Sequence, residues 1–445
     1  MNAKELLLFI ESEKTQECLK KLYGNDKNIL DFQKNRYNSL IESFCKRFGD
    51  GNIRLFSSPG RSEIGGNHTD HNLGKVLAAS IQLDCIAAIE KTDDGIISIV
   101  DLTYNEDFCI KVAESERKNG ETGSIALVRG MIEAFKKMGF VVGGFKGVFT
   151  SSVIAAAGVS SSASFEMLIC LILNNLYNEQ KLSICQMASI GQFAEQKYWD
   201  KNSGLLDQMA CASGGLVSID FENPKNPKCE KIDFDFSKEN YDLILVNTGK
   251  GHADLSAEYS AVPNEMKAVA NFLGKETLRG VNFEQIIENL PQLRENCGDR
   301  AVMRAFHYLA ENEKVEKEID ALKNNNFKSF LSLITASGNS SWKWLQNVYV
   351  ATNQTEQPIC VSLALTETFI EKNCPPNSEK PGVCRIHGGG FAGVIMAFLP
   401  KELTENYKNY MYKALGVKEG ENSPIYIMSI RPKGAVEITK VFEID

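Results

Sequence analysis

The chain contains 445 residues, of which 43% are hydrophobic and 24% charged, and its formal net charge at pH 7 is −8. This length predicts two or three domains of ordinary globular composition, and the negative charge argues against nucleic acid or an anionic membrane as the main partner. The 12 cysteines include no C-x-x-C pair, and the first residues, MNAKELLLFIESEK, resemble neither a signal peptide nor a membrane span. We therefore expect a reduced protein located in the cytoplasm.

Helical and strand-like segments follow one another without a regular βαβ alternation. Apolar spacing predicts helices over residues 1–50, and residues 53–60 predict a short strand that ends at Pro59 and Gly60. A glycine-rich loop, several strands and an amphipathic helix over residues 124–140 come next. The polar segment ENPKNPKCEK predicts a boundary between two domains, residues 1–222 and 223–445, and the predicted fold class is α+β.

A run of small residues, AAAGVSSSASFEM at 155–167, holds three consecutive serines and opens an apolar segment. The residues before it predict a strand. A strand, a small-residue loop and a helix start direct backbone N–H groups, the positive end of the helix and serine hydroxyls at one point. This arrangement suits a phosphate group, although the same letters alone are typical of a flexible connection.

Two further clusters lie among glycines. His68-Thr69-Asp70-His71 has no second group of ligands nearby, which disfavours zinc and favours hydrogen bonds from His68 and Asp70 to a hydroxyl-rich ligand such as a sugar. Residues 388–393 satisfy G-x-G-x-x-G, but VIMAFLP after them predicts a strand, whereas a dinucleotide fingerprint requires a helix. We interpret these glycines as backbone that must approach another group closely.

Glu195 and Asp207 lie twelve residues apart. Each could be a solvated acid at a helix end, which is the commoner case for a single carboxylate. Asp207, however, lies between Leu206 and Met209 in an apolar, small-residue stretch. A carboxylate there needs a partner, and pairing with an arginine in a catalytic site would supply one.

Three ordered motifs resemble the galactokinase family of the GHMP small-molecule kinases. GRSEIGGNHTDHN is similar to the family signature G-R-[VI]-N-L-I-G-E-H-T-D-Y-N, AGVSSSAS to G-L-S-S-S-A-S, and RIHGGGFAG to R-[ML]-T-G-G-G-F-G-G. The spacing from Glu195 to Asp207 also fits, and the resemblance covers roughly residues 35 to 440. It implies a two-domain GHMP kinase fold. The N-terminal domain would be ribosomal protein S5 domain 2-like and bind the sugar and the ATP phosphates, and the C-terminal domain would be ferredoxin-like.

The resemblance implies an ATP- and Mg²⁺-dependent kinase that phosphorylates the anomeric hydroxyl of galactose to give galactose 1-phosphate. Asp207 is expected beside that hydroxyl as a base or an electrostatic partner, with Arg61 keeping Asp207 ionised and stabilising charge on the phosphoryl group. Ser162 and Glu195 are expected to hold Mg²⁺. The residues expected to bind the sugar are Asn67, His68, Asp70, Gly204 and Tyr259. The residues expected to cradle the ATP phosphates are Ala157, Gly158, Val159, Ser160, Ser161, Ser162 and Ala163, and those expected to close the site from the second domain are Gly388, Gly389 and Gly390.

Departures from the family pattern leave the substrate open. Asn67 replaces a glutamate, Glu63 an asparagine and His71 a tyrosine. An amide at position 67 removes a negative charge, so a uronate carboxylate would be tolerated, and a galacturonokinase or arabinokinase is the alternative. A non-catalytic sensor of sugar and ATP is a further alternative, disfavoured by the intact catalytic positions. We expect a small-molecule sugar as partner, neither nucleic acid nor membrane, and a monomer, with an oligomer left open.

Overall fold

The structure is a computed structural model that describes residues 1–443 except 155–157, 202, 250–254, 419 and 421–422. Its α-helices are α1 (Ala3–Glu11), α2 (Glu13–Tyr23), α3 (Lys27–Phe48), α4 (Gly123–Lys137), α5 (Ser161–Tyr177), α6 (Ile184–Tyr198), α7 (Leu206–Ser213), α8 (Ser256–Phe272), α9 (Phe283–Glu288), α10 (Leu290–Cys297), α11 (Asp299–Lys323), α12 (Phe327–Ser340), α13 (Pro358–Asn373) and α14 (Thr404–Leu415). Its strands are β1 (Arg54–Gly65), β2 (Lys75–Lys91), β3 (Ile96–Asp101), β4 (Glu106–Lys111), β5 (Phe145–Ser151), β6 (Leu216–Asp220), β7 (Lys228–Ile232), β8 (Tyr241–Asn247), β9 (Val383–His387), β10 (Val394–Pro400), β11 (Ile425–Met428) and β12 (Val436–Glu437).

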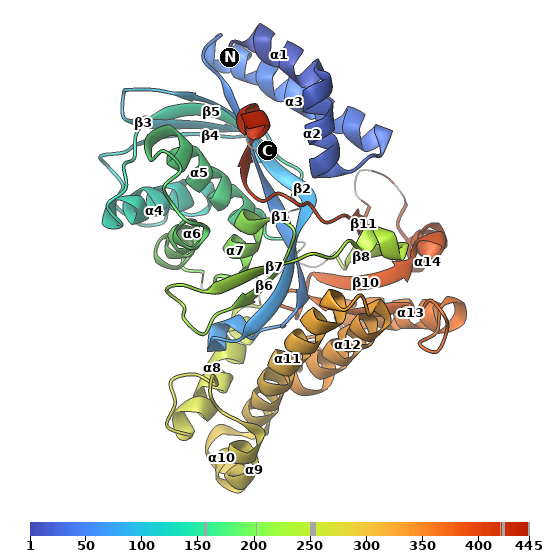
Figure 1. Cartoon of the computed structure of the whole chain (residues 1–445). Helices are drawn as coiled ribbons and strands as arrows, with labels where there is room; N and C mark the ends of the chain where they lie inside the picture. Colours follow the sequence, from blue (N-terminus) through green and yellow to red (C-terminus); the bar gives the residue numbers. More distant parts are fainter. Residues whose placement is uncertain (155–157, 202, 250–254, 419, 421–422, 444–445) are drawn as a thin grey trace.

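The first sheet has the strand order β12-β1-β2-β5-β3-β4, and β6 and β7 extend it from β2. Helices α1–α3 lie against one face of this sheet and α4–α7 against the other (Figure 1). The alternation along β2 explains this: Ile86 and Ala88 belong to the core under α1–α3, whereas Ala87 and Ile89 belong to the core under α4 and α5. Because successive side chains of a strand point to opposite faces, a fully apolar run requires cover on both.

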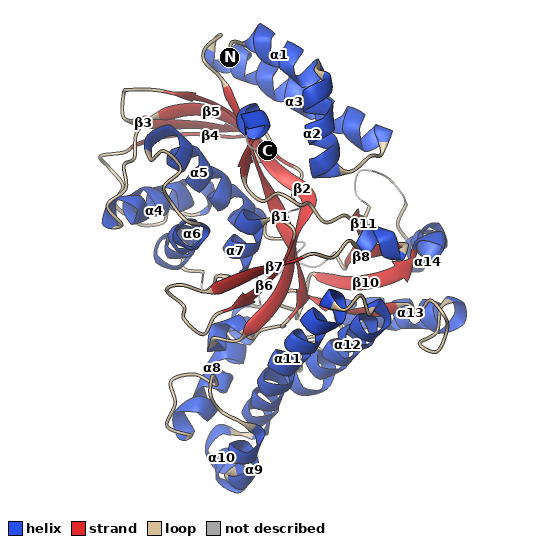
Figure 2. Ribbon diagram, viewed as in Figure 1, coloured by secondary structure: helices blue, strands red, loops and turns tan. Residues whose placement is uncertain are grey.

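The second sheet is antiparallel, with the order β11-β8-β10-β9. Its two faces are also covered, by α11 and α12 on one side and by α13 and α14 on the other (Figure 2). Every residue of β10 is buried, which matches its uninterrupted apolar sequence. The predicted α+β class is confirmed.

The chain crosses between the two sheets more than once. After the second sheet it returns to the first, where Val436 and Glu437 of β12 pair with Ser57 and Phe56 of β1. The predicted boundary after residue 222 falls in the connection between β6 and β7, and it stays a prediction. In the described part of the chain, no helix combines the length and apolarity that a membrane crossing requires.

The sequence-based prediction for β1 was wrong in one respect. The strand does not end at Pro59 and Gly60 but continues to Gly65, with a register shift between Pro59 and Arg61. Proline has no backbone N–H to donate to a ladder, and an irregularity in the pairing accommodates it. The consequence is functional, because Arg61 then lies on a rigid strand.

The glycine cluster after His387 joins β9 to β10 as neighbouring antiparallel strands. No helix opens after the cluster, so the sequence-based rejection of a dinucleotide fingerprint is confirmed.

Candidate active site

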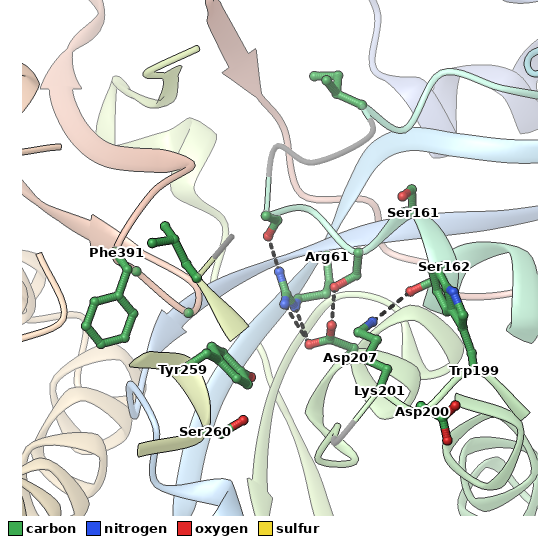
Figure 3. Close-up of a pocket in the computed structure, with 16 residues that line it drawn as sticks. Arg61, Ser161, Ser162, Trp199, Asp200, Lys201, Asp207, Tyr259, Ser260 and Phe391 are labelled. Carbon is green, nitrogen blue, oxygen red and sulfur yellow. Dashed lines mark hydrogen bonds and ion pairs between the residues drawn. The ribbon is translucent and has the colours of Figure 1, made fainter. Parts of the chain in front are cut away.

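An arginine–aspartate pair lies at the centre of the site. Arg61 comes from β1, and Asp207 comes from the first turn of α7. Arg61 donates to Oδ1 of Asp207 through Nε at 2.9 Å and through Nη2 at 2.6 Å, and its Nη1 donates to the carbonyl of Gly158. Ser160 donates to the other carboxylate oxygen of Asp207 at 2.5 Å. Figure 3 shows Arg61 and Asp207 facing each other. The carboxylate is therefore held in one orientation by three donors.

Asp207 is kept ionised by its neighbours. Burial raises the pKa of its carboxyl group, but the positive charges of Arg61 and Lys201 and the hydrogen bond from Ser160 outweigh burial, so the pKa lies below its ordinary value. The side chain of Asp207 remains 28% exposed, whereas that of Arg61 is 8% exposed. Asp207 can thus contact a bound molecule while Arg61 supports it from behind.

The residues 158–162, called the serine loop below, place the N-terminus of α5 beside Asp207. Gly158 and Ser160 both have a positive φ, of 64° and 61°, which turns the chain before α5 begins at Ser161. Ser160 makes no side-chain capping bond to the helix, because its hydroxyl is bonded to Asp207. The first N–H groups of a helix have no partner within it, so this end suits an anion. Of the predicted phosphate-binding residues, Gly158 and Ser160 to Ser162 line a cavity of about 490 Å³. Ala157 lies outside the described residues.

The predicted metal ligands are adjacent. Ser162 donates to Oε1 of Glu195, on α6, at 2.7 Å, and Nζ of Lys201 contacts both side chains. A hydroxyl and a carboxylate are hard oxygen ligands of the kind that Mg²⁺ prefers, and Mg²⁺ commonly takes one or two protein ligands together with phosphates. Over the described residues, no group of three or more His, Cys, Asp or Glu side chains could hold a metal alone. The donor set therefore fits a metal that takes its remaining ligands from water or from the phosphates of a nucleotide.

A buried amide organises the carboxylates behind this pair. Nε2 of Gln208 donates to Glu166 at 2.9 Å and to Glu195 at 3.1 Å. Burial, together with the charge of Glu195, raises the pKa of Glu166 well above its ordinary value. Burial therefore favours the neutral form of Glu166, and Glu195 is the member of the pair that contacts Lys201.

Two cavities share the Arg61–Asp207 pair as part of their walls. The larger, of about 490 Å³, is lined by the serine loop, Trp199 and Phe391, and the smaller, of about 70 Å³, by the 63–71 loop and the 203–206 segment. The residues that line both cavities are Arg61, Lys201, Asp207, Tyr259 and Gly389. A chemical group transferred between molecules bound in the two cavities would move past these five residues.

The smaller cavity brings together most of the residues predicted to bind a sugar. Nε2 of His68 lies 2.8 Å from the carbonyl oxygen of Gly389, and its Nδ1 has no hydrogen-bond partner among the described residues. Burial lowers the pKa of His68 to about 3, so the ring is neutral and Nδ1 is an acceptor. Tyr259 packs on His68 with ring centroids 5.3 Å apart. A Cβ on Gly204 would lie 1.9 Å from Oδ2 of Asp70, so only glycine allows that approach.

Asn67 lies behind this cavity and does not line it. Its side chain is buried, and Nδ2 donates to Oε1 of Glu63 at 2.8 Å and to the carbonyl of Gly388 at 2.7 Å. Its Oδ1 accepts from Asn347 at 2.8 Å. Both ends of the Asn67 amide are thus hydrogen-bonded within the protein. Glu63 is the residue of this pair that lines the cavity.

The glycines at 388–390 connect the second sheet to the first. The carbonyls of Gly388 and Gly389 accept from Asn67 and His68, and a Cβ on Gly389 would lie 2.6 Å from the Tyr259 ring. Gly390 has a φ of 82°, and a Cβ there would lie 2.2 Å from the carbonyl of Asn347. The predicted close approach of this backbone is therefore present, and both cavities include Gly389 in their walls.

Three residues of the site, Lys201, Glu166 and Asn347, were not predicted from the sequence. Lys201 could have been noticed as a basic residue in the run between the two motif acids. Glu166 reads as an ordinary helix residue, and Asn347 is distant from every motif, so only the folded chain shows their positions.

Comparison with known proteins gives a consistent result. The galactokinase galactose-binding signature matches residues 42–91, and the GHMP kinases N terminal domain matches residues 126–215. A galactokinase of Glaesserella parasuis is 28% identical over 398 residues, which cover 86% of this chain and 95% of that protein. A galactokinase of Clostridium tetani is 26% identical over 396 residues, which cover 86% and 94%.

Two solved kinase structures share the fold of this chain, which confirms the predicted GHMP kinase fold. Lactococcus lactis galactokinase complexed with galactose has a TM-score of 0.74 at 23% identity, and the match covers 89% of this chain and 98% of that one. A mevalonate kinase has a TM-score of 0.55 at 17% identity, with 85% and 99% covered.

Proposed function

Because the chain belongs to the galactokinase family of the GHMP kinases, we propose that it transfers the γ-phosphoryl group of ATP to the anomeric hydroxyl of galactose and forms galactose 1-phosphate. The observation that carries this proposal is the Arg61–Asp207 pair at the junction of the two cavities. The larger cavity has the helix start that suits phosphates, and the smaller has the short polar groups that suit a sugar. Phosphoryl transfer asks mainly for positioning and charge stabilisation at such a junction.

In this proposal the phosphates lie against the start of α5 and the residues from Gly158 to Ser162. Ser162 and Glu195 hold Mg²⁺, which when bound neutralises phosphate charge and orients the triphosphate. Arg61, already fixed by Asp207 and the carbonyl of Gly158, stabilises negative charge on the phosphoryl group as it crosses.

Asp207 receives a hydrogen bond from the anomeric hydroxyl. A carboxylate with a lowered pKa is a weak base, so its first task is to orient the hydroxyl oxygen toward the γ-phosphorus. As the oxygen–phosphorus bond forms, the hydroxyl proton becomes acidic and Asp207 can take it up. Ser160 and Arg61 prevent the carboxylate from turning away during this step.

The smaller cavity favours a neutral sugar over a uronate. The negative charge that Asn67 lacks is present four residues earlier, at Glu63, and the two side chains are hydrogen-bonded at 2.8 Å. Burial raises the pKa of Glu63 even though Arg385 opposes the effect, which means that this place tolerates negative charge poorly. A uronate carboxylate would add a second charge beside it. We therefore propose that His68, Asp70, Gly204, Tyr259 and Glu63 surround galactose, with Asn67 positioning Glu63.

We also propose that the enzyme works in the cytoplasm as a monomer. Its twelve cysteines are free thiols, which suits a reducing compartment. The site described above is assembled within one chain.

A coupled ADP-release assay with MgATP tests the function. Galactose, galacturonate and arabinose are compared side by side, and the product is identified by the coupling of its anomeric proton to phosphorus. We expect the highest kcat/KM with galactose and an anomeric phosphate as product. Asp207→Ala should abolish turnover while the protein still binds nucleotide. A preference for galacturonate would contradict the charge argument, and wild-type binding of both ligands without turnover would indicate a sensor.

A further inference from the structure

Lys201 occupies the position that the proposed function assigns to a metal ion. Its Nζ donates to Oγ of Ser162 at 3.1 Å (Figure 3). The same Nζ contacts Oε1 of Glu195. These are the two oxygens expected to hold Mg²⁺, and an ammonium group bonded to both leaves no room there for a second cation. We propose that Lys201 holds this cation position before nucleotide binds, and that it moves onto the phosphates of ATP when the metal takes its place. This inference rests on the proposed kinase function.

The side chain of Lys201 is free to make this move. It is 43% exposed and lies in the segment between the end of α6 at Tyr198 and the start of α7 at Leu206. It lines both cavities, so a short rotation of a flexible four-carbon stem keeps it within the space where a phosphoryl group passes. Arg61 differs, because its guanidinium is nearly buried and bonded to Asp207 and to the carbonyl of Gly158.

The charge of the site requires such a cation. Of the described residues that line the two cavities, only Arg61 and Lys201 are lysine or arginine, and Arg61 is matched by Asp207. Lysine is a cation at neutral pH, and Nζ of Lys201 lies against the carboxylate of Glu195. If a metal neutralised Glu195, the ammonium would lose this partner and could pair with the phosphates in the larger cavity.

A purely structural role would give a different result. The ammonium also lies 5.6 Å from the centre of the Trp199 ring, and its role could be only to hold Trp199 and Lys201 against α5 and α6. Removing a purely structural contact would lower the unfolding temperature of the protein, and it would weaken metal binding or leave it unchanged. The proposed role predicts the opposite sign for metal affinity, because a competitor for the two oxygens has been removed.

The experiment compares wild type with Lys201→Met and Lys201→Arg. Lys197→Met, which changes an exposed lysine on α6, is the matched control. The dissociation constant of Mn²⁺ is measured by electron paramagnetic resonance on nucleotide-free protein, and kcat and the KM for ATP are measured with MgATP. The unfolding temperature of each variant is recorded to verify folding.

For Lys201→Met we expect Mn²⁺ to bind at least about fivefold more tightly and kcat to fall about 100-fold, the size of effect seen when one charge-stabilising donor is removed. Lys201→Arg should keep more of kcat than Lys201→Met, and the control should match wild type in both measurements. Unchanged or weaker Mn²⁺ binding in a folded Lys201→Met protein would overturn the proposal. Because the Mn²⁺ measurement needs no substrate, it remains decisive if the wild type proves to phosphorylate no sugar.

Discussion

Replacing Asp84 by asparagine tests the contact that joins the N-terminal helices to the rest of the protein. Asp84, on β2, is fully buried and accepts hydrogen bonds from Tyr23 and Ser57 at 2.5 Å, from Arg36 at 2.7 Å and from Arg431 at 2.9 Å. Burial raises its pKa, but the two arginines outweigh burial and hold the pKa below its ordinary value. Arg431 is fully buried and Arg36 is 10% exposed, so Asp84→Asn leaves two guanidinium groups around a neutral amide.

Breaking a buried ion pair by removing one partner costs about 3–5 kcal/mol, a large part of a total stability of about 5–15 kcal/mol. An unfolding entropy of about 2.1 cal/mol/K per residue, applied to 445 residues, converts this into a fall in Tm of about 3–5 °C. Since the folded-state pKa is lowered, the stabilisation is fully present above the unfolded pKa of about 3.9 and is lost as pH falls through the folded value. The difference between variant and wild type should therefore be the same at pH 7 and pH 5.5.

Urea unfolding and thermal melts followed by circular dichroism measure this difference at both pH values. Asp107→Asn is the matched control, because Asp107 forms an exposed pair with Arg47 at 3.0 Å and its side chain is 54% exposed. Exposed pairs contribute about 0–1 kcal/mol, so the control should unfold almost like wild type. A loss below about 1 kcal/mol for Asp84→Asn, or a loss equal to that of the control, would refute the reasoning.

Two further substitutions test the site. Ser160→Ala removes a charge-assisted hydrogen bond to Asp207, worth about 1.5–3 kcal/mol. We expect kcat/KM to fall by about 10- to 100-fold, and the acid limb of its pH profile to move to higher pH because the pKa of Asp207 rises. An unshifted profile with full activity would contradict this role. Gly204→Ala places a Cβ 1.9 Å from Oδ2 of Asp70, so that carboxylate must move. The KM for the sugar should rise at least about tenfold while the KM for ATP stays constant, and an unchanged sugar KM would show that Asp70 does not bind the sugar.

Glu63 and Asn67 show where motif reasoning reached its limit. The sequence shows a glutamate replaced by asparagine at 67 and an asparagine replaced by glutamate at 63, and read one position at a time this suggested a lost charge. The structure shows the two side chains joined by a hydrogen bond, so a carboxylate still lies beside position 67. Spacing along a sequence does not reveal this, because β1 and the turn after it bend back on each other only in the folded chain.

Lys201 is a second residue whose role the sequence motifs did not reveal. It stands in the polar run Asp200-Lys201-Asn202-Ser203, and such a composition is typical of a solvated loop. Only the packing of α5 against α6 brings Ser162 and Glu195 within reach of its ammonium group.

The sequence by itself determined the elements with strong local signals. The apolar runs determined the buried strands of both sheets and helix α5, and the run VIMAFLP after the glycines was sufficient to exclude a dinucleotide fold. The small-residue loop before α5 was predicted as an anion site, because orphaned N–H groups at a helix start depend on local backbone alone. The three motifs were also sufficient to indicate the kinase family.

Only the tertiary structure determined which polar side chains lie together in the site. The Arg61–Asp207 pair joins residues 146 positions apart, and the Asn67–Gly388 contact joins residues 321 apart. Such contacts depend on how two sheets and their helices pack, which no local pattern records. The electrostatics follow from the same packing, since the pKa of Asp207 is lowered and that of Glu166 raised by neighbours that only the fold supplies.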